Sequence, residues 1–267
     1  GGAAILLVMR GADFRKAWRQ VLCVALVSMA FFLPKEESSA GIGSSFERGK
    51  QVYLAEGCIH CHSQYVRPGT ADVERWGPAG ITLSSSRPVL IGNRRQGPDL
   101  SNVGARRSAA WLKQHFIDPQ AFSPGTTMPS YGHLFEDGRG DDLVSYLRQS
   151  GEAHLAERME QAANWNPPDV PSSGDGKVLF SRQCAVCHGP GGKGDSPLAT
   201  DLAKPPANLV DGPFVWSASG PDEALKISRI IRFGIAGTDM PGHETLADSQ
   251  IIALRDHVLN LRKRSAE

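Results

Sequence analysis

The pattern Cys-x-x-Cys-His constrains this chain most, because it occurs twice. The copies are Cys58, Cys61 and His62, and Cys184, Cys187 and His188. On one helical turn, cysteines three positions apart share a face, and the next residue can turn its imidazole toward the same point. This arrangement attaches a c-type haem through two cysteines, with the histidine as a ligand of the iron. The sequence therefore predicts two covalently bound haem c groups, with His62 and His188 as proximal ligands.

Two other kinds of site use paired cysteines. Four thiolates drawn from both pairs could hold zinc, but the histidine after each pair would then have no role. A thioredoxin-like redox pair is expected once, within a pattern of alternating strands and helices that we do not find in this sequence. We therefore favour haem over both alternatives.

The segments around the two motifs are similar to each other. Residues 49–62 align with residues 176–188, with one additional residue before the first cysteine of the first copy. Each copy continues to a Met-Pro pair and then to an apolar helical pattern, which we expect to begin at Asp141 and at Asp248. A repeat of this kind indicates two small helical domains.

The predicted fold is all-α. Gly and Pro are frequent, with 29 and 18 residues, so we expect compact but loop-rich domains. The predicted segments are a signal peptide or membrane anchor at 1–44, a first domain at 45–150, a linker at 151–174 and a second domain at 175–267. Within the linker, residues 152–163 suit a short polar helix and residues 164–173 a stiff, Pro-rich spacer.

Each haem iron needs a second axial ligand. Of the five methionines, Met128 and Met240 are the two that precede a proline, and each stands in an irregular stretch before a helix. A thioether opposite imidazole raises the reduction potential and closes the iron to other ligands, which favours electron transfer over catalysis. We predict these methionines as the distal ligands, with His133 and His243 as competing candidates.

The proximal histidines need a hydrogen-bond acceptor for their other ring nitrogen. We expect the carbonyl group of Pro98 to serve His62 and that of Pro206 to serve His188. Trp111 and Trp216 are candidate haem contacts.

The first forty residues differ from the rest. Four basic residues, Arg10, Arg15, Lys16 and Arg19, precede an uncharged run at 21–33 that Pro34 ends. This run is shorter than the roughly 20 residues of a comfortable membrane span. It suits a signal peptide cleaved after Ala40, or a thin anchor that is not cleaved; a helix inside a soluble domain is the third alternative. The basic flank predicts that the remainder lies on the periplasmic side of the bacterial inner membrane.

The charges of the chain nearly balance. Lys and Arg number 29, and Asp and Glu number 28, which gives a net charge of +1. Without a basic surplus, we predict no nucleic-acid partner.

With these motifs, the chain resembles a tandem of class I cytochromes c. The second half carries the resemblance at 184–189, 191–194, 206–209 and 237–242. The first half, at 57–68, 74–77 and 97–100, resembles the mono-haem, membrane-anchored subunit of cbb-type (C-family) haem-copper oxidases. It departs from that family at Tyr65 and Trp76, and in having a second haem domain.

The resemblance implies a dihaem electron-transfer subunit of, or direct donor to, a haem-copper oxidase or related respiratory complex, rather than a catalyst by itself. The expected partners are that membrane complex and a redox donor or acceptor protein. An independent periplasmic dihaem carrier is the alternative in the same class. A dihaem cytochrome c peroxidase also carries two such motifs, but it must open one iron to peroxide, and the two Met-Pro pairs disfavour this.

Overall fold

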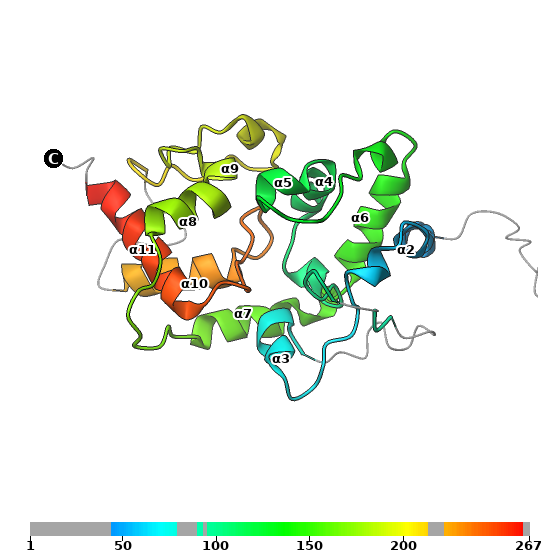
Figure 1. Ribbon diagram of the computed structural model, residues 1–267, viewed down its shortest axis with the longest axis horizontal. Coiled ribbons are helices and arrows are strands. Elements are labelled where there is room, and N and C mark those ends of the chain that lie inside the picture. The colour runs from blue at the N-terminus through cyan, green and yellow to red at the C-terminus, as the bar shows by residue number, and fades with distance from the viewer. Residues whose placement is uncertain (1–43, 79–89, 93–94, 213–221, 264–267) are drawn as a thin grey trace, which may run out of the picture. The chain divides into compact units, whose positions relative to one another are not determined.

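The computed structural model describes residues 44–78, 90–92, 95–212 and 222–263 (Figure 1). Regular structure in these residues is helical, and the β-type pairing among them is an isolated bridge between Gly234 and Pro241. The all-α prediction is thus confirmed for the described part of the chain. These described residues form one compact unit.

The elements, with 3-10 helices marked η, run in the order α2 (Ser45–Ala55), η1 (Cys58–His60), α3 (Ala71–Trp76), η2 (Val103–Ala105), α4 (Ala109–Ile117), α5 (Pro119–Phe122), η3 (Gly132–Phe135), α6 (Arg139–Gln149), η4 (Glu152–His154), α7 (Leu155–Asn164), α8 (Gly176–Gln183), α9 (Ala185–His188), η5 (Pro197–Asp201), α10 (Glu223–Phe233) and α11 (Asp248–Lys263).

The first hydrophobic core lies where α2 packs against α6, which Figure 1 shows beside each other. Tyr53 of α2 and Tyr146 of α6 are fully buried there. The helices approach closely because α2 has Gly49 at the crossing, where a Cβ atom would collide with the carbonyl oxygen of Asp142. The hydroxyl group of Ser44 accepts from the N–H of Glu47 and caps the start of α2.

The second core repeats this plan with α8, α10 and α11. Phe180 of α8 packs there with Ile231 of α10 and Leu254 of α11. Gly176, the counterpart of Gly49 in the sequence repeat, lies against the carbonyl oxygen of Ala253, with which a Cβ atom would collide. The sequence repeat is therefore matched by a repeated helix crossing.

The predicted polar helix of the linker is present as α7, which packs against α10. Its Arg158 is buried, with 8% of its surface exposed. This helix thus contributes to the compact unit, in addition to connecting the two cores.

The predicted signal or anchor segment, residues 1–44, lies outside the described residues except for Ser44. Among the helices of the described residues, none combines the length and the apolar character needed to cross a bilayer.

Candidate haem sites

The first Cys-x-x-Cys-His motif forms a tight turn after α2. Gly57, in the left-handed region at φ 71°, leads into η1, and the N–H of His62 donates to the carbonyl oxygen of Cys58 at 2.8 Å. The hydroxyl group of Tyr53 donates to the carbonyl oxygen of His62 at 2.7 Å. The buried Tyr53 of α2 therefore fixes the backbone of the proposed proximal ligand.

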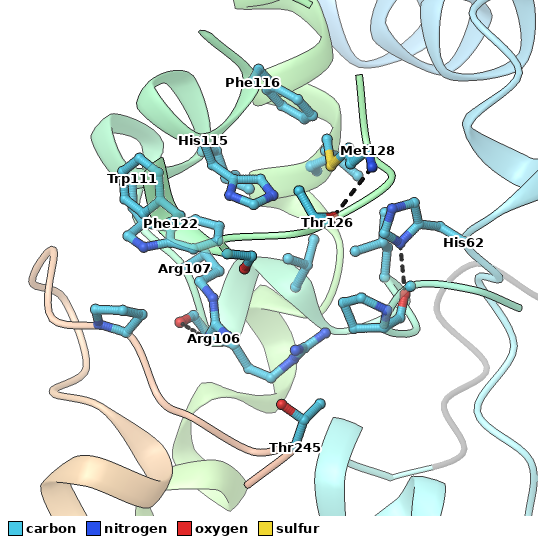
Figure 2. A pocket seen from close by; sticks show the side chains of 18 of the residues that line it. His62, Arg106, Arg107, Trp111, His115, Phe116, Phe122, Thr126, Met128 and Thr245 are labelled. Atoms are coloured by element: carbon cyan, nitrogen blue, oxygen red, sulfur yellow. Dashed lines mark hydrogen bonds between the residues drawn. The ribbon is translucent and has the colours of Figure 1, made fainter. Parts of the chain in front are cut away.

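The imidazole of His62 is oriented from the opposite side. Its Nδ1 lies 2.9 Å from the carbonyl oxygen of Pro98, the acceptor that the sequence analysis named (Figure 2). Because a carbonyl can only accept, Nδ1 carries the proton and Nε2 keeps its lone pair for a metal. Burial lowers the pKa of His62, although the Pro98 carbonyl opposes this effect, so the ring stays neutral. Gly97 lies so close that a Cβ atom would collide with the ring.

The second motif is built in the same way at the end of α8. The N–H of His188 donates to the carbonyl oxygen of Cys184 at 2.9 Å, and burial lowers the pKa of His188. The Nδ1 of His188 lies 3.0 Å from the carbonyl oxygen of Ala207, so the acceptor is Ala207 and not the predicted Pro206. The carbonyl oxygen of Pro206 is turned toward Gly194, where a Cβ atom would collide with it, and the next carbonyl therefore faces the histidine.

Both candidate distal methionines lie at the cavity that the two motifs line. The N–H of Met128 donates to the side chain of Thr126, and that of Met240 to the side chain of Thr238, each at 3.2 Å. Each methionine thus follows a threonine that holds its backbone. The repeat extends from the proximal motifs to the distal loops.

The competing histidines differ in their positions. The side chain of His133 is 52% exposed and lies 3.8 Å from the carboxylate of Glu56, outside the residues that line the cavity. His243 lines the cavity, and burial lowers its pKa to about 4. Of the two, His243 alone is placed to compete with a methionine.

The two sites open into one cavity of about 320 Å³. Figure 2 shows its first half, with His62, His115 and Met128 around the space and Arg106, Arg107 and Trp111 along the wall. Cys184, Cys187, His188 and Met240 line the same cavity from the second half. The two proposed haem sites are therefore adjacent within the compact unit.

Buried polar atoms at this cavity suit a haem. The Nε atoms of Arg106 and Trp111 and the Nδ1 atom of His115 are buried and have no hydrogen-bond partner. Unpaired buried donors are costly, and haem carries two propionate groups that accept hydrogen bonds. Apolar side chains such as Leu100 and Leu147 line the rest of the wall. The residues present thus fit the porphyrin that the motifs require.

The alternatives to haem do not fit the geometry. Within the described residues, no three or more His, Cys, Asp or Glu side chains converge on a point as a metal ion would require, so the cysteines do not form a zinc site. Burial raises the pKa of Cys58 to about 11 and that of Cys184 to about 12, whereas reactive redox thiols have lowered pKa values.

Sequence reasoning missed part of this wall. His115, which the sequence analysis did not single out, lines the cavity, and burial lowers its pKa to about 4. Arg106 and Arg107 line it as well. Two arginines directly before a helix oppose its dipole, and this signal could have indicated a partner elsewhere in the fold. Trp111 lines the cavity as expected, whereas Trp216 lies outside the described residues.

Two family models match the chain in succession. Residues 37–160 match the mono-haem subunit of cytochrome c oxidase, FixO, and residues 172–258 match subunit III of cbb3-type cytochrome c oxidase.

Two curated relatives carry related descriptions. The cbb3-type cytochrome c oxidase subunit CcoP of Azospirillum brasilense is 24% identical over 261 residues, which cover 96% of this chain and 74% of that protein. The cbb3-type cytochrome c oxidase subunit FixP of Azorhizobium caulinodans is 26% identical over 98 residues, 36% of this chain, and the match spans 30% of FixP. A solved structure, the reducing HAO-like protein complex Kustc0457/Kustc0458 of Kuenenia stuttgartiensis, has a TM-score of 0.30 and 20% identity, covering 81% of this chain and 96% of that one.

The chain is therefore a c-type cytochrome with two covalently bound haem c groups, whose first domain is similar to FixO and whose second is similar to subunit III of cbb3-type oxidases.

Proposed function

We propose that this protein transfers single electrons as a subunit of, or direct donor to, a cbb3-type haem-copper oxidase on the periplasmic side of the membrane. The observation that carries the proposal is the common cavity, which both Cys-x-x-Cys-His motifs and both Met-Pro segments line. The descriptions of CcoP and FixP support the oxidase as the partner. Residues 1–44 are the proposed signal or anchor.

The proposed ligands are His62 and Met128 for the first haem, and His188 and Met240 for the second. When bound, each haem supplies an iron that accepts and releases one electron. Burial lowers the pKa of both proximal imidazoles, and the carbonyl groups of Pro98 and Ala207 accept from Nδ1, which leaves Nε2 as the nitrogen with the free lone pair. With Met128 and Met240 as second protein ligands, a bound haem would have no open position for a substrate, as an electron carrier requires.

The partner is tested by purifying the tagged full chain from detergent-solubilised membranes. We expect two haem c groups per chain by pyridine haemochrome analysis, together with copper and the other subunits of an oxidase. A freely soluble monomer without a haem-copper partner would contradict the proposal and favour the independent carrier. Carbon monoxide binding to a reduced haem of the intact protein would favour a peroxidase.

The ligands are tested by Met128→His and Met240→His. Each substitution is expected to lower one midpoint potential by more than about 59 mV, a tenfold change in a one-electron equilibrium, and to leave the other in place. The sulfur-to-iron band near the red end of the visible spectrum should fall by about half in each variant. An unchanged redox titration would refute that ligand. Met159→His is the control, because Met159 is 55% exposed and lies outside the residues that line the common cavity.

A further inference from the structure

Hydrogen bonds within the second half of the molecule hold one side of the loop that carries Met240, and the N–H of His243 donates to the carbonyl oxygen of Ile231 at 2.9 Å. The carbonyl oxygen of Met240 accepts from the N–H of Ile235 at 3.1 Å, and the carboxylate of Asp239 accepts from the N–H of Ala203 at 2.6 Å. Gly234, at φ 76°, lets the end of α10 pass close to the backbone of this loop. Additional contacts on both sides of Met240 come from the first half of the chain.

Ser108 and Arg107, neighbours at the start of α4, bind the loop on either side of Met240. The hydroxyl group of Ser108 donates to the carboxylate of Asp239, the residue directly before Met240. The Nη2 atom of Arg107 donates to the carbonyl oxygen of Gly242, two residues after Met240, at 2.9 Å. The same guanidinium group donates to both carboxylate oxygens of Glu244, at 3.1 and 2.8 Å.

These two side chains are themselves fixed in the first half. The hydroxyl group of Ser108 accepts from the N–H of Trp111 at 3.0 Å and so caps α4. The guanidinium group of Arg107 lies 4.9 Å from the centre of the Trp111 ring, and Arg148 donates to the carbonyl oxygen of Arg107. Figure 2 shows Arg107 and Trp111 beside each other in the wall of the cavity.

Burial makes the contact strong. The side chain of Glu244 is 3% exposed and that of Arg107 is 11% exposed. A bidentate ion pair between a guanidinium group and a carboxylate is stronger and more directional than a neutral hydrogen bond, and water competes little for these groups when they are buried. A movement of the loop away from α4 would leave both buried charges with fewer partners.

We propose that Arg107 and Ser108 are positioning residues that hold the Met240 loop of the second domain, so that the first domain maintains the thioether on the second haem iron. This inference rests on the proposed function, because it takes Met240 as the distal ligand. It adds that the ligation of one haem depends on side chains of the domain that binds the other.

The test uses the full dihaem protein with Arg107→Ala, Arg107→Lys and Ser108→Ala. In Arg107→Ala we expect the sulfur-to-iron band to weaken and the affinity of one haem for added imidazole to rise about tenfold or more. The midpoint potential that moves should be the one that Met240→His shifts, while the other stays at its wild-type value. Arg107→Lys should restore part of the band, because a lysine keeps the charge but loses the bidentate ion pair.

Arg139→Ala is the matched control, because Arg139 forms an exposed ion pair with Glu56 at 2.8 Å, away from the loop. A role in folding stability alone would leave the band and the imidazole affinity of the folded protein unchanged. If Arg107→Ala does not fold, Ser108→Ala is used instead, and we expect a smaller weakening of the sulfur-to-iron band and a smaller rise in the affinity for imidazole. The inference alone is overturned if the folded Arg107 and Ser108 variants keep the wild-type band, imidazole affinity and potentials while Met240→His still shifts one potential. An ineffective Met240→His overturns the ligand assignment of the proposed function.

Discussion

Glu244 lies buried among three arginines at the junction of the two halves. Its carboxylate is 2.8 Å from Arg107, 2.6 Å from Arg158 and 4.0 Å from Arg106. Burial by itself would raise the pKa of Glu244, but the charges of the arginines outweigh it and lower the pKa from 4.5 to about 2. The ionised form of Glu244 is therefore more favourable in the folded protein than in the unfolded chain, so ionisation stabilises the fold.

Glu244→Gln is expected to destabilise the protein by about 3 to 5 kcal/mol at neutral pH, because it leaves buried arginines without their acid. The difference in free energy of unfolding between wild type and Glu244→Gln is fully present above the ordinary pKa of 4.5. It is lost as the pH falls toward about 2, because protonation of Glu244 then removes the same charge in the wild type. Urea unfolding of both proteins at several pH values measures this difference.

A difference between wild type and variant that stays constant as the pH falls would contradict this origin. Glu157→Gln is the control, because the Glu157 side chain is 60% exposed and its change should stay within about 0.5 kcal/mol.

The individual residues that could be predicted from the sequence are those marked by a pattern of neighbouring residues. A proximal histidine follows its cysteines directly, so Cys58 to His62 could be recognised from spacing. The acceptor for His188 was misplaced by one residue, because the turn at Gly194 decides which carbonyl faces the ring. The pairing of Arg107 with Glu244 joins residues far apart in the chain, and no local pattern marks it.

Among the elements, the two helix crossings depend on a missing side chain. At Gly49 a Cβ atom would collide with the carbonyl oxygen of Asp142 and lie 2.6 Å from the Cβ atom of Tyr146. At Gly176 it would collide with the carbonyl oxygen of Ala253. Because the obstacle in both cases includes backbone, a rotamer change cannot relieve it.

Gly49→Ala and Gly176→Ala are each expected to destabilise the protein by about 1 to 3 kcal/mol or more, because the packed helices must separate. Thermal unfolding of the dihaem protein measures the loss. Gly191→Ala is the matched control, since a Cβ atom there meets nothing within 4 Å. Equal midpoints for all three variants would mean that the crossings relax without cost.

The helices themselves were largely accessible to sequence reasoning. The last helix begins at Asp248 as predicted, whereas α6 begins at Arg139, two residues before the expected Asp141. The linker helix was expected at 152–163 and forms as η4 followed by α7. The polar composition of α7 gave no indication that Arg158 is buried. Its burial depends on Glu244 and on the carbonyl oxygen of Phe233, which are distant in the sequence and lie in the second half of the chain.

At the scale of the molecule, contacts that range from buried to exposed join the two cores. Arg232 of α10 lies 2.9 Å from Glu74 of α3, and Arg107 binds Glu244. Gln161 of α7 donates to the carbonyl oxygen of Glu74 at 2.9 Å. The common cavity adds further apolar and polar wall that belongs to both halves. Domains joined in this way are expected to lose structure together, because opening the junction separates the ion pairs that cross it and leaves their charges with fewer partners.

The dihaem protein should therefore unfold in a single calorimetric transition, and Gly49→Ala and Gly176→Ala should both lower the midpoint of that transition. Alanine at both Glu74 and Glu244 removes ion pairs from two places in the junction and is expected to split the transition in two. In that background each glycine variant should lower one transition and spare the other, since each crossing belongs to one core. Two transitions in the wild-type protein would show instead that the junction contributes little to cooperativity, and that each core unfolds independently of the other.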